Sequence, residues 1–181
     1  MQINKGFNEF EAREEADRQV YSAFTSNYKI CNYKATEDKY AYIDEQLTGI
    51  TENGISRYDI EIKSRDSNWL YNDCILEVEK YNKLMRFSLN EEKIYFVIYP
   101  KLNKIYIWNM NDFTRAELYK IYNPKFLCNE KTADDRTIKI EKEVFHLPFN
   151  KAKSFDFNSF KWYEEIYDYL NSKHKNGNTK F

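Results

Sequence analysis

The sequence predicts a single α/β domain. Its 181 residues are enough for one domain with a buried hydrophobic core. Some segments have apolar residues at helical spacing, and others alternate apolar and polar residues as β-strands do. These segments follow one another with no repeat or linker between them. The apolar fraction of 42% is too high for a disordered chain, and the charged fraction of 31% is too high for a membrane protein. We therefore expect one mixed domain of helices and strands.

The first third of the chain predicts one helix followed by three strands. Residues 8–24 contain neither glycine nor proline, and their apolar side chains from Phe10 to Phe24 share one arc of a helical wheel. Three segments rich in β-forming residues follow, with apolar and polar positions alternating. The strands are expected over residues 28–33, 40–47 and 56–64, and a turn over 49–54.

A second helix, a hairpin and an extension are predicted next. Residues 71–89 place Ile75, Val78, Leu84 and Met85 on one face of a helix. The hairpin has strands over 94–99 and 104–110, joined by a turn at 100–103. The extension has a short helix from about 111 to 122, strands over 125–127 and 137–147, a helix over 158–170 and a polar tail over 171–181. We assign residues of about 8–110 to a core and about 111–170 to the extension.

Composition and missing motifs exclude several chemistries. Cys31, Cys74 and Cys128 cannot all pair and form no Cys-x-x-Cys motif, which argues against a disulfide scaffold or a zinc ribbon. His146 and His174 leave little room for histidine-based metal chemistry or a nucleophile triad. With four glycines, phosphate-binding glycine loops are not expected. No apolar stretch approaches the ~20 residues of a membrane span, and no signal-peptide segment is recognised, so we expect a cytoplasmic protein.

One group of charged residues has the pattern of a metal site. Asp44 lies in the second predicted strand, and Glu61-Ile62-Lys63 lies in the third. Because side chains alternate along a strand, Glu61 and Lys63 share one face. If the two strands are neighbours, Asp44 lies near Glu61. Two carboxylates suit a hard cation such as Mg²⁺, which activates a bound water, and a lysine can stabilise the charge that develops on a phosphate.

These residues resemble the motif of the PD-(D/E)XK nuclease superfamily, which has the restriction-endonuclease-like fold. The core of that family is an αβββαβ unit, and the predicted order of elements over residues 8–110 is similar to it. The resemblance implies that Asp44, Glu61 and the carbonyl of Ile62 bind Mg²⁺ or Mn²⁺ and that Lys63 assists catalysis. The sequence departs from the family pattern in having Ile43, where many members have proline before the aspartate.

The resemblance implies supporting residues on the two helices. Many members carry a glutamate on the first helix, for which Glu14 is the best-placed candidate. Many also carry a glutamine or lysine on the helix after the Glu-x-Lys motif, for which Lys80 is the candidate. Contacts to DNA phosphates are then expected from Lys83, Arg86 and Arg65.

Simpler interpretations remain open for these residues. Asp59, Glu61, Lys63 and Arg65 can be the solvated face of an exposed strand, and Asp59 can replace Asp44 as the acidic ligand. Further simple interpretations are a Glu14 to Arg18 pair, a Lys80 to Glu77 pair and a packed His146. A Cys74 thiol at a helix start would have a lowered pKa, but no His or Asn partner is evident in the sequence, so thiol chemistry is not expected.

The predicted function is a metal-dependent DNA nuclease, most simply an endonuclease that acts as a homodimer on its DNA partner. The main alternative is a catalytically inactive module of the same fold that serves as a protein-interaction or regulatory domain. A third interpretation is a free-standing α/β protein in which the spacing of the aspartate and the Glu-x-Lys motif is accidental. The net charge of −1 hides an acidic segment over residues 1–60 and a basic one over 61–125. A metal nuclease needs acids for the cation and bases for the phosphates, so we expect DNA binding that weakens quickly with salt.

Overall fold

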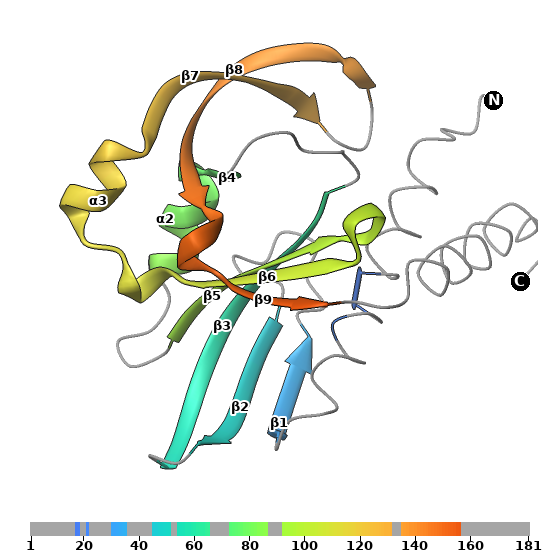
Figure 1. Ribbon diagram of the computed structural model, residues 1–181, viewed down its shortest axis with the longest axis vertical. Helices are drawn as coiled ribbons and strands as arrows, with labels where there is room; N and C mark the ends of the chain where they lie inside the picture. Colours follow the sequence, from blue (N-terminus) through green and yellow to red (C-terminus); the bar gives the residue numbers. More distant parts are fainter. Residues whose placement is uncertain are drawn as a thin grey trace, which may run out of the picture.

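The computed structural model describes residues 17–18, 21, 30–35, 45–51, 54–65, 73–86, 92–131 and 135–156. Within these residues the protein is a mixed α/β structure built on two β-sheets (Figure 1). The predicted α/β class is therefore confirmed. No helix in the described part of the chain has the length and apolar character needed to cross a membrane.

The larger sheet has six strands in the order β1-β2-β3-β5-β6-β9. The first three form an antiparallel meander, β5 runs parallel to β3, and β6 and β9 continue antiparallel. A parallel neighbour needs a crossover connection, and the segment that contains helix α2 (Val78–Arg86) supplies it. The strands are β1 (Ile30–Ala35), β2 (Glu45–Thr51), β3 (Gly54–Ser64), β5 (Glu92–Tyr99), β6 (Lys104–Asn109) and β9 (Lys153–Asp156).

The smaller sheet has three antiparallel strands in the order β4-β8-β7. Its strands β7 and β8 form a long curved hairpin that arches away from the larger sheet (Figure 1). The bounds are β4 (Asp73–Glu77), helix α3 (Arg115–Lys120), β7 (Tyr122–Lys131) and β8 (Asp135–Pro148), with single 3₁₀ turns at Pro100–Leu102, Met110–Asp112 and Phe149–Lys151.

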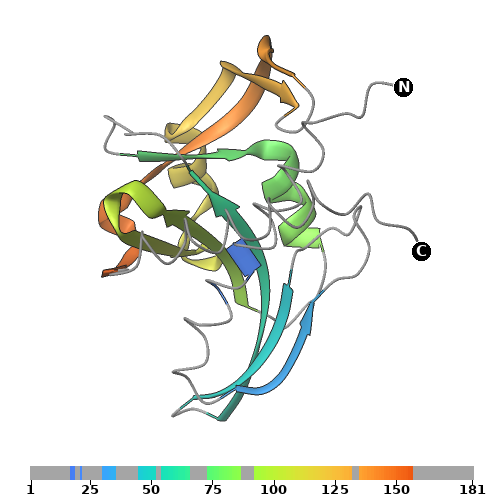
Figure 2. The same ribbon diagram turned by 90° about the vertical axis from the view of Figure 1, so that its right-hand side faces the viewer.

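Both faces of the larger sheet are covered by hydrophobic clusters. On β5, Tyr95 and Val97 point into a cluster shared with α2, α3 and the smaller sheet. Phe96 and Ile98 point to the opposite face, where Tyr21 packs edge-on against Phe96 with ring centroids 5.1 Å apart. A central strand buried on both faces explains the nearly continuous apolar run of β5. Apolar side chains of the sheet are therefore buried on both of its faces around β5, and α2 packs beside β3 (Figure 2).

The described elements run strand, strand, strand, strand, helix, strand, so the order predicted from the sequence lacks the strand β4 that precedes the helix. Residues 73–77 belong to β4 and not to the helix expected over 71–89. The apolar run Cys74-Ile75-Leu76 pairs with β8, with Cys74 opposite Leu147, and all three residues are buried. Tertiary pairing therefore overrides the helical spacing of this segment.

The turns differ in how well the sequence predicts them. The expected turn over 49–54 is shorter, because β2 continues to Thr51 and β3 begins at Gly54. The expected hairpin turn after β5 is confirmed, and Asn103 adopts a left-handed conformation with φ of 50°, which asparagine tolerates better than most residues. Strand β9 has no counterpart among the predicted elements. The predicted helices over 8–24 and 158–170 lie mostly or wholly outside the described residues.

Candidate functional site

Strand β3 holds the charged residues of the candidate site on one face. Asp59 is 0% exposed and Glu61 is 3% exposed, while Ile60 and Ile62 are buried in the cluster on the opposite face. Asp59 and Glu61 are therefore not part of a solvated strand face, and that simpler interpretation is wrong for these two residues. Carboxylates this deeply buried need a cationic or hydrogen-bonding partner, because the loss of hydration is otherwise too costly.

Glu61 has such a partner on the neighbouring helix. The Nζ of Lys80, on α2, lies 3.0 Å from Glu61 Oε1. The side chain of Lys80 is 37% exposed, whereas that of Glu61 is 4% exposed. Glu77, the partner of Lys80 in the simpler interpretation, meets Lys142 at 3.1 Å. The structure thus brings together Glu61 and the lysine that the family resemblance indicates on this helix.

Asp59 is engaged in a second, fully enclosed pair. Its Oδ2 forms a short ion pair with Nζ of Lys93, and the two side chains are 0% and 3% exposed. Gln46 Nε2 donates to the other carboxylate oxygen at 3.3 Å. Asp59 and Lys93 are also direct partners in the parallel ladder of β3 and β5. Because both oxygens of Asp59 have protein partners, this residue is a poor replacement for Asp44 as a metal ligand.

The remaining residues of the predicted metal site are placed only in part. Lys63 is half-buried and follows Glu61 by two residues, so both share a face of β3. Ile62 is buried on the opposite face, and its carbonyl remains a prediction as a ligand. Asp44 and Glu14 lie outside the described residues. Strand β2, which begins at Glu45, pairs with β3, and the placement of Asp44 near Glu61 stays a prediction.

The described part of this site offers a divalent cation one suitable ligand, the carboxylate of Glu61. The ammonium of Lys80 beside Glu61 shows that the carboxylate attracts a positive charge there. Among the described residues, no three His, Cys, Asp or Glu side chains come together in a way that could hold a metal ion. A cation at Glu61 therefore needs a further ligand, and Asp44 is the one that the sequence indicates.

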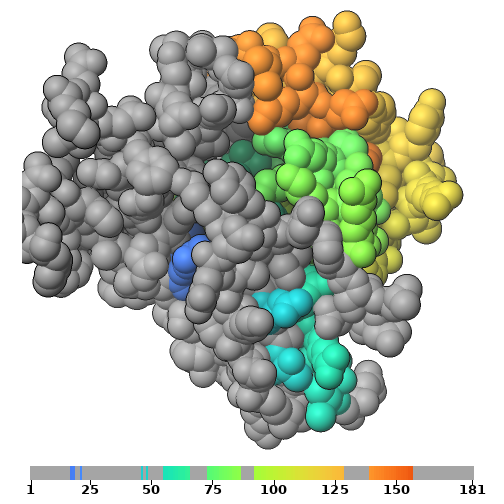
Figure 3. Space-filling view, turned by 180° about the vertical axis from the view of Figure 1, so that it is seen from behind, coloured from blue at the N-terminus to red at the C-terminus, as the bar shows by residue number. Residues whose placement is uncertain are grey.

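The basic residues predicted to contact DNA have different surroundings. Arg65 donates from Nη2 to the carbonyl of Ile75 at 2.7 Å and to the hydroxyl of Tyr95 at 3.3 Å, so its guanidinium ties β3 to β4 and β5. This internal role argues against the predicted phosphate contact of Arg65. Lys83 is 35% exposed and pairs with Glu79 at 2.6 Å, and Arg86 is exposed. Both lie on α2, part of which is at the molecular surface (Figure 3).

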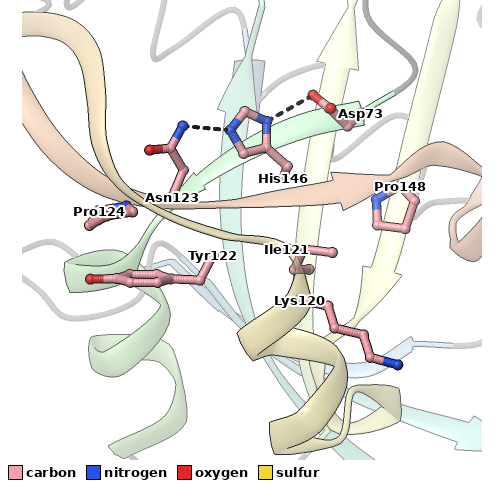
Figure 4. A pocket seen from close by; sticks show the side chains of 8 residues that line it. All are labelled: Asp73, Lys120, Ile121, Tyr122, Asn123, Pro124, His146 and Pro148. Atoms are coloured by element: carbon pink, nitrogen blue, oxygen red, sulfur yellow. Dashed lines mark hydrogen bonds and ion pairs between the residues drawn. The ribbon is translucent and has the colours of Figure 1, made fainter.

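A second polar group surrounds His146 in a shallow pocket near the smaller sheet (Figure 4). The Nδ1 of His146 lies 3.3 Å from Asp73 Oδ1, and Nε2 lies 3.5 Å from Asn123 Nδ2. The ring of Phe126 packs edge-on against the imidazole at 5.3 Å. The side chain of Lys120 points away from this group (Figure 4). His146 therefore connects β4 and β7 across β8, which fits the prediction of a packed side chain.

Cys74 is not an activated thiol. It lies on β4 of the smaller sheet, 1% exposed within the hydrophobic core, and not at a helix start. Burial raises the pKa of the Cys74 thiol above its usual value, although the nearby Arg65 opposes this. The prediction of a lowered pKa is therefore wrong, and the exclusion of thiol chemistry gains a physical reason.

The chain is similar to solved structures, whereas the other comparisons with known proteins give no match. No protein-family model matches the chain, and no curated protein matches it. The matching solved structures include a Holliday junction resolvase, Hjc, from the archaeal hyperthermophile Archaeoglobus fulgidus. That match covers 86% of this chain and 96% of the resolvase, with 11% sequence identity and a TM-score of 0.38. The function proposed below therefore rests on residues of this chain.

Proposed function

We propose that the protein is a metal-dependent DNA endonuclease that hydrolyses phosphodiester bonds. One observation supports this most directly. The antiparallel register of β2 and β3 runs up to the pair Glu45–Ile60. Asp44 directly precedes Glu45, and Glu61 directly follows Ile60. One more step of the same ladder would therefore place Asp44 opposite Glu61. Opposite residues in an antiparallel pair share a face and lie about 5 Å apart at Cβ.

This proposal gives each residue of the motif a role. Asp44 and Glu61 would hold Mg²⁺ or Mn²⁺, with the Ile62 carbonyl as a further ligand. When bound, such a cation lowers the pKa of a coordinated water enough to supply hydroxide near neutral pH. Lys63, on the Glu61 face, would orient the attacking water and stabilise negative charge on the phosphate. Glu14 is proposed as an additional acidic group of the site.

DNA contacts would come from the exposed side of α2. Lys83 and Arg86 are proposed to bind phosphates on either side of the cleaved bond. Two strands of a duplex require two cuts, so we also propose that two copies of the chain act together. With few phosphate contacts per copy, binding would be modest and would weaken as salt rises.

The test is cleavage of plasmid, linear and branched DNA with Mg²⁺ or Mn²⁺. The wild-type chain is expected to cut, and both Glu61→Gln and Lys63→Ala are expected to lose at least about a hundredfold in rate, the lower range for one positioned catalytic group. Lys153→Ala is the matched control, because Lys153 is an exposed lysine on β9. Cleavage that continues unchanged in Lys63→Ala would remove that residue from the mechanism, and no cleavage by the wild-type chain would argue against the nuclease.

A second candidate function is a protein-interaction module on the same scaffold. A groove between α2 and α3 is lined mostly by apolar and aromatic side chains, among them Tyr81, Met85, Leu118 and Phe145. Tyr119 at this groove is 82% exposed. Exposed apolar surface of this kind is typical of interaction sites. This function is favoured if purified protein neither cuts DNA nor binds Mn²⁺, and if Tyr119→Ala abolishes capture of a specific protein partner.

A further inference from the structure

The two lysine–carboxylate pairs on β3 differ in their access to solvent. In the pair of Asp59 and Lys93 both side chains are almost completely enclosed, at 0% and 3% exposure. In the pair of Glu61 and Lys80 the carboxylate is enclosed at 4%, but the lysine is 37% exposed. The two pairs share one face of the strand and the same chemistry. Only the second has a cation that can leave without crossing the protein interior.

Physical chemistry explains why Glu61 has a lysine beside it. A carboxylate with this little solvent contact is stable only beside positive charge. Lysine carries its charge on a flexible four-carbon chain and binds as a single point charge. A partly exposed ammonium regains water when it turns outward, so its release costs little free energy once another cation takes its place beside Glu61. Glu61 can therefore exchange one cation for another.

We propose that Lys80 is a stand-in cation, which neutralises Glu61 until a divalent metal ion binds and is then released toward the phosphate of bound DNA. This inference rests on the proposed function, because it requires a metal site at Glu61. It goes further by making metal binding and Lys80 competitors for one carboxylate. It also predicts that DNA strengthens metal binding, because the released ammonium gains a phosphate partner. By thermodynamic linkage, the metal strengthens DNA binding by the same factor.

The test is calorimetric titration of Mn²⁺ into the full-length chain. We expect Lys80→Met to bind Mn²⁺ about tenfold more tightly than the wild type, a factor that corresponds to ~1.4 kcal/mol. The matched control is Lys83→Met on the same helix, whose lysine is 35% exposed and pairs with Glu79 instead. Because both variants remove one positive charge from α2, a gain restricted to Lys80→Met reports direct competition. Lys80→Arg keeps the charge and is expected to bind Mn²⁺ no more tightly than the wild type.

Folding and metal binding can be separated by measuring melting temperature in the same samples. Lys80→Met is expected to melt below the wild type without metal and to gain more from Mn²⁺ than the wild type does. Equal or weaker Mn²⁺ binding by a folded Lys80→Met, with binding intact in the wild type, would overturn the stand-in role and leave the nuclease proposal in place. If no variant, including the wild type, binds Mn²⁺, both proposals fail. If Lys80→Met does not fold, tighter binding by Lys80→Gln supports the proposal and unchanged binding overturns it.

Discussion

Asp59 and Glu61 are two residues apart on one strand, yet their surroundings differ in kind. Asp59 is joined to Lys93, its direct partner on the neighbouring strand, and to Gln46 on the other side. Glu61 is joined to Lys80, which comes from a helix and reaches solvent. A pair made within the sheet cannot separate unless the sheet opens. A pair between the sheet and a helix can exchange its cation while the sheet stays intact.

This difference suggests that the enclosed pair has a structural role and the open pair a functional one. Buried ion pairs contribute little net stability against apolar replacements, but they can specify a register. We infer that Asp59 and Lys93 specify the register of the parallel pair β3 and β5, which fixes where Glu61 lies.

The largest effect is expected from Lys93→Met. This change leaves the Asp59 carboxylate buried and uncompensated, so the free energy of unfolding should fall by about 3–5 kcal/mol. Urea denaturation followed by circular dichroism measures it. The double variant Asp59→Leu with Lys93→Met should recover most of the loss. A loss below about 1 kcal/mol in the single variant would contradict an enclosed, coupled pair.

A smaller loss of stability is expected from Lys80→Met without metal. Glu61 stays buried but can draw water through the space that Lys80 vacates, so about 2 kcal/mol is expected, between the values for exposed and enclosed pairs. The same urea titration measures it. A loss equal to that of Lys93→Met would mean that the two pairs do not differ as described.

A third lysine–carboxylate pair, Lys83 with Glu79, extends the comparison to the surface. Glu79 is 73% exposed, and its pKa is lowered mainly by the hydrogen bond from Lys83. We expect Lys83→Ala to leave the free energy of unfolding nearly unchanged. The slope of log DNA affinity against log salt concentration should fall by about 1, the value for one lost phosphate contact. Fluorescence anisotropy at several salt concentrations measures the slope. Arg86→Ala is expected to lower the slope by the same amount. An unchanged slope in both variants would show that DNA does not contact this side of α2.

The smallest effect concerns the exposed pair of Glu117 and Lys151 at the start of α3. The hydrogen bond from Lys151, together with the backbone N–H of Thr114, lowers the pKa of Glu117 to about 2 from an ordinary value of 4.5. A lowered pKa stabilises the fold above pH 4.5, and that contribution is lost as pH falls toward 2. Carboxyl-carbon NMR titration should give a midpoint near 2. A midpoint near 4.5 would show that the pair and the cap are not formed in solution.

Much of the fold could be predicted from the sequence because periodicity reports local structure. The alternation in β3 and the apolar run of β5 follow directly from which side chains are buried. Strand β4 could not be predicted in this way, because its three buried residues fit a helix equally well until β8 pairs with them. The missed β9 pairs for only four residues at the edge of the sheet, so it carries little periodic signal.

The residues of the candidate site could be predicted from the sequence motif, but most of the ion-pair and hydrogen-bond partners of its charged side chains could not. The spacing of Glu61 and Lys63 predicts a shared face, and the resemblance indicates Lys80, which the structure places 3.0 Å from Glu61. Sequence alone could not show that Asp59 meets Lys93, because the two are 34 residues apart and paired only by the parallel ladder. The internal role of Arg65 depends likewise on β4, whose strand character the sequence did not reveal.

The central claim is that Asp44 and Glu61 share one divalent cation, and Mn²⁺ titration of Asp44→Asn tests it most directly. The substitution preserves size and removes one charge. Calorimetry should show a Mn²⁺ site in the wild type that Asp44→Asn and Glu61→Gln each weaken at least about tenfold, which is 1.4 kcal/mol. Wild-type Mn²⁺ affinity in a folded Asp44→Asn would contradict the claim.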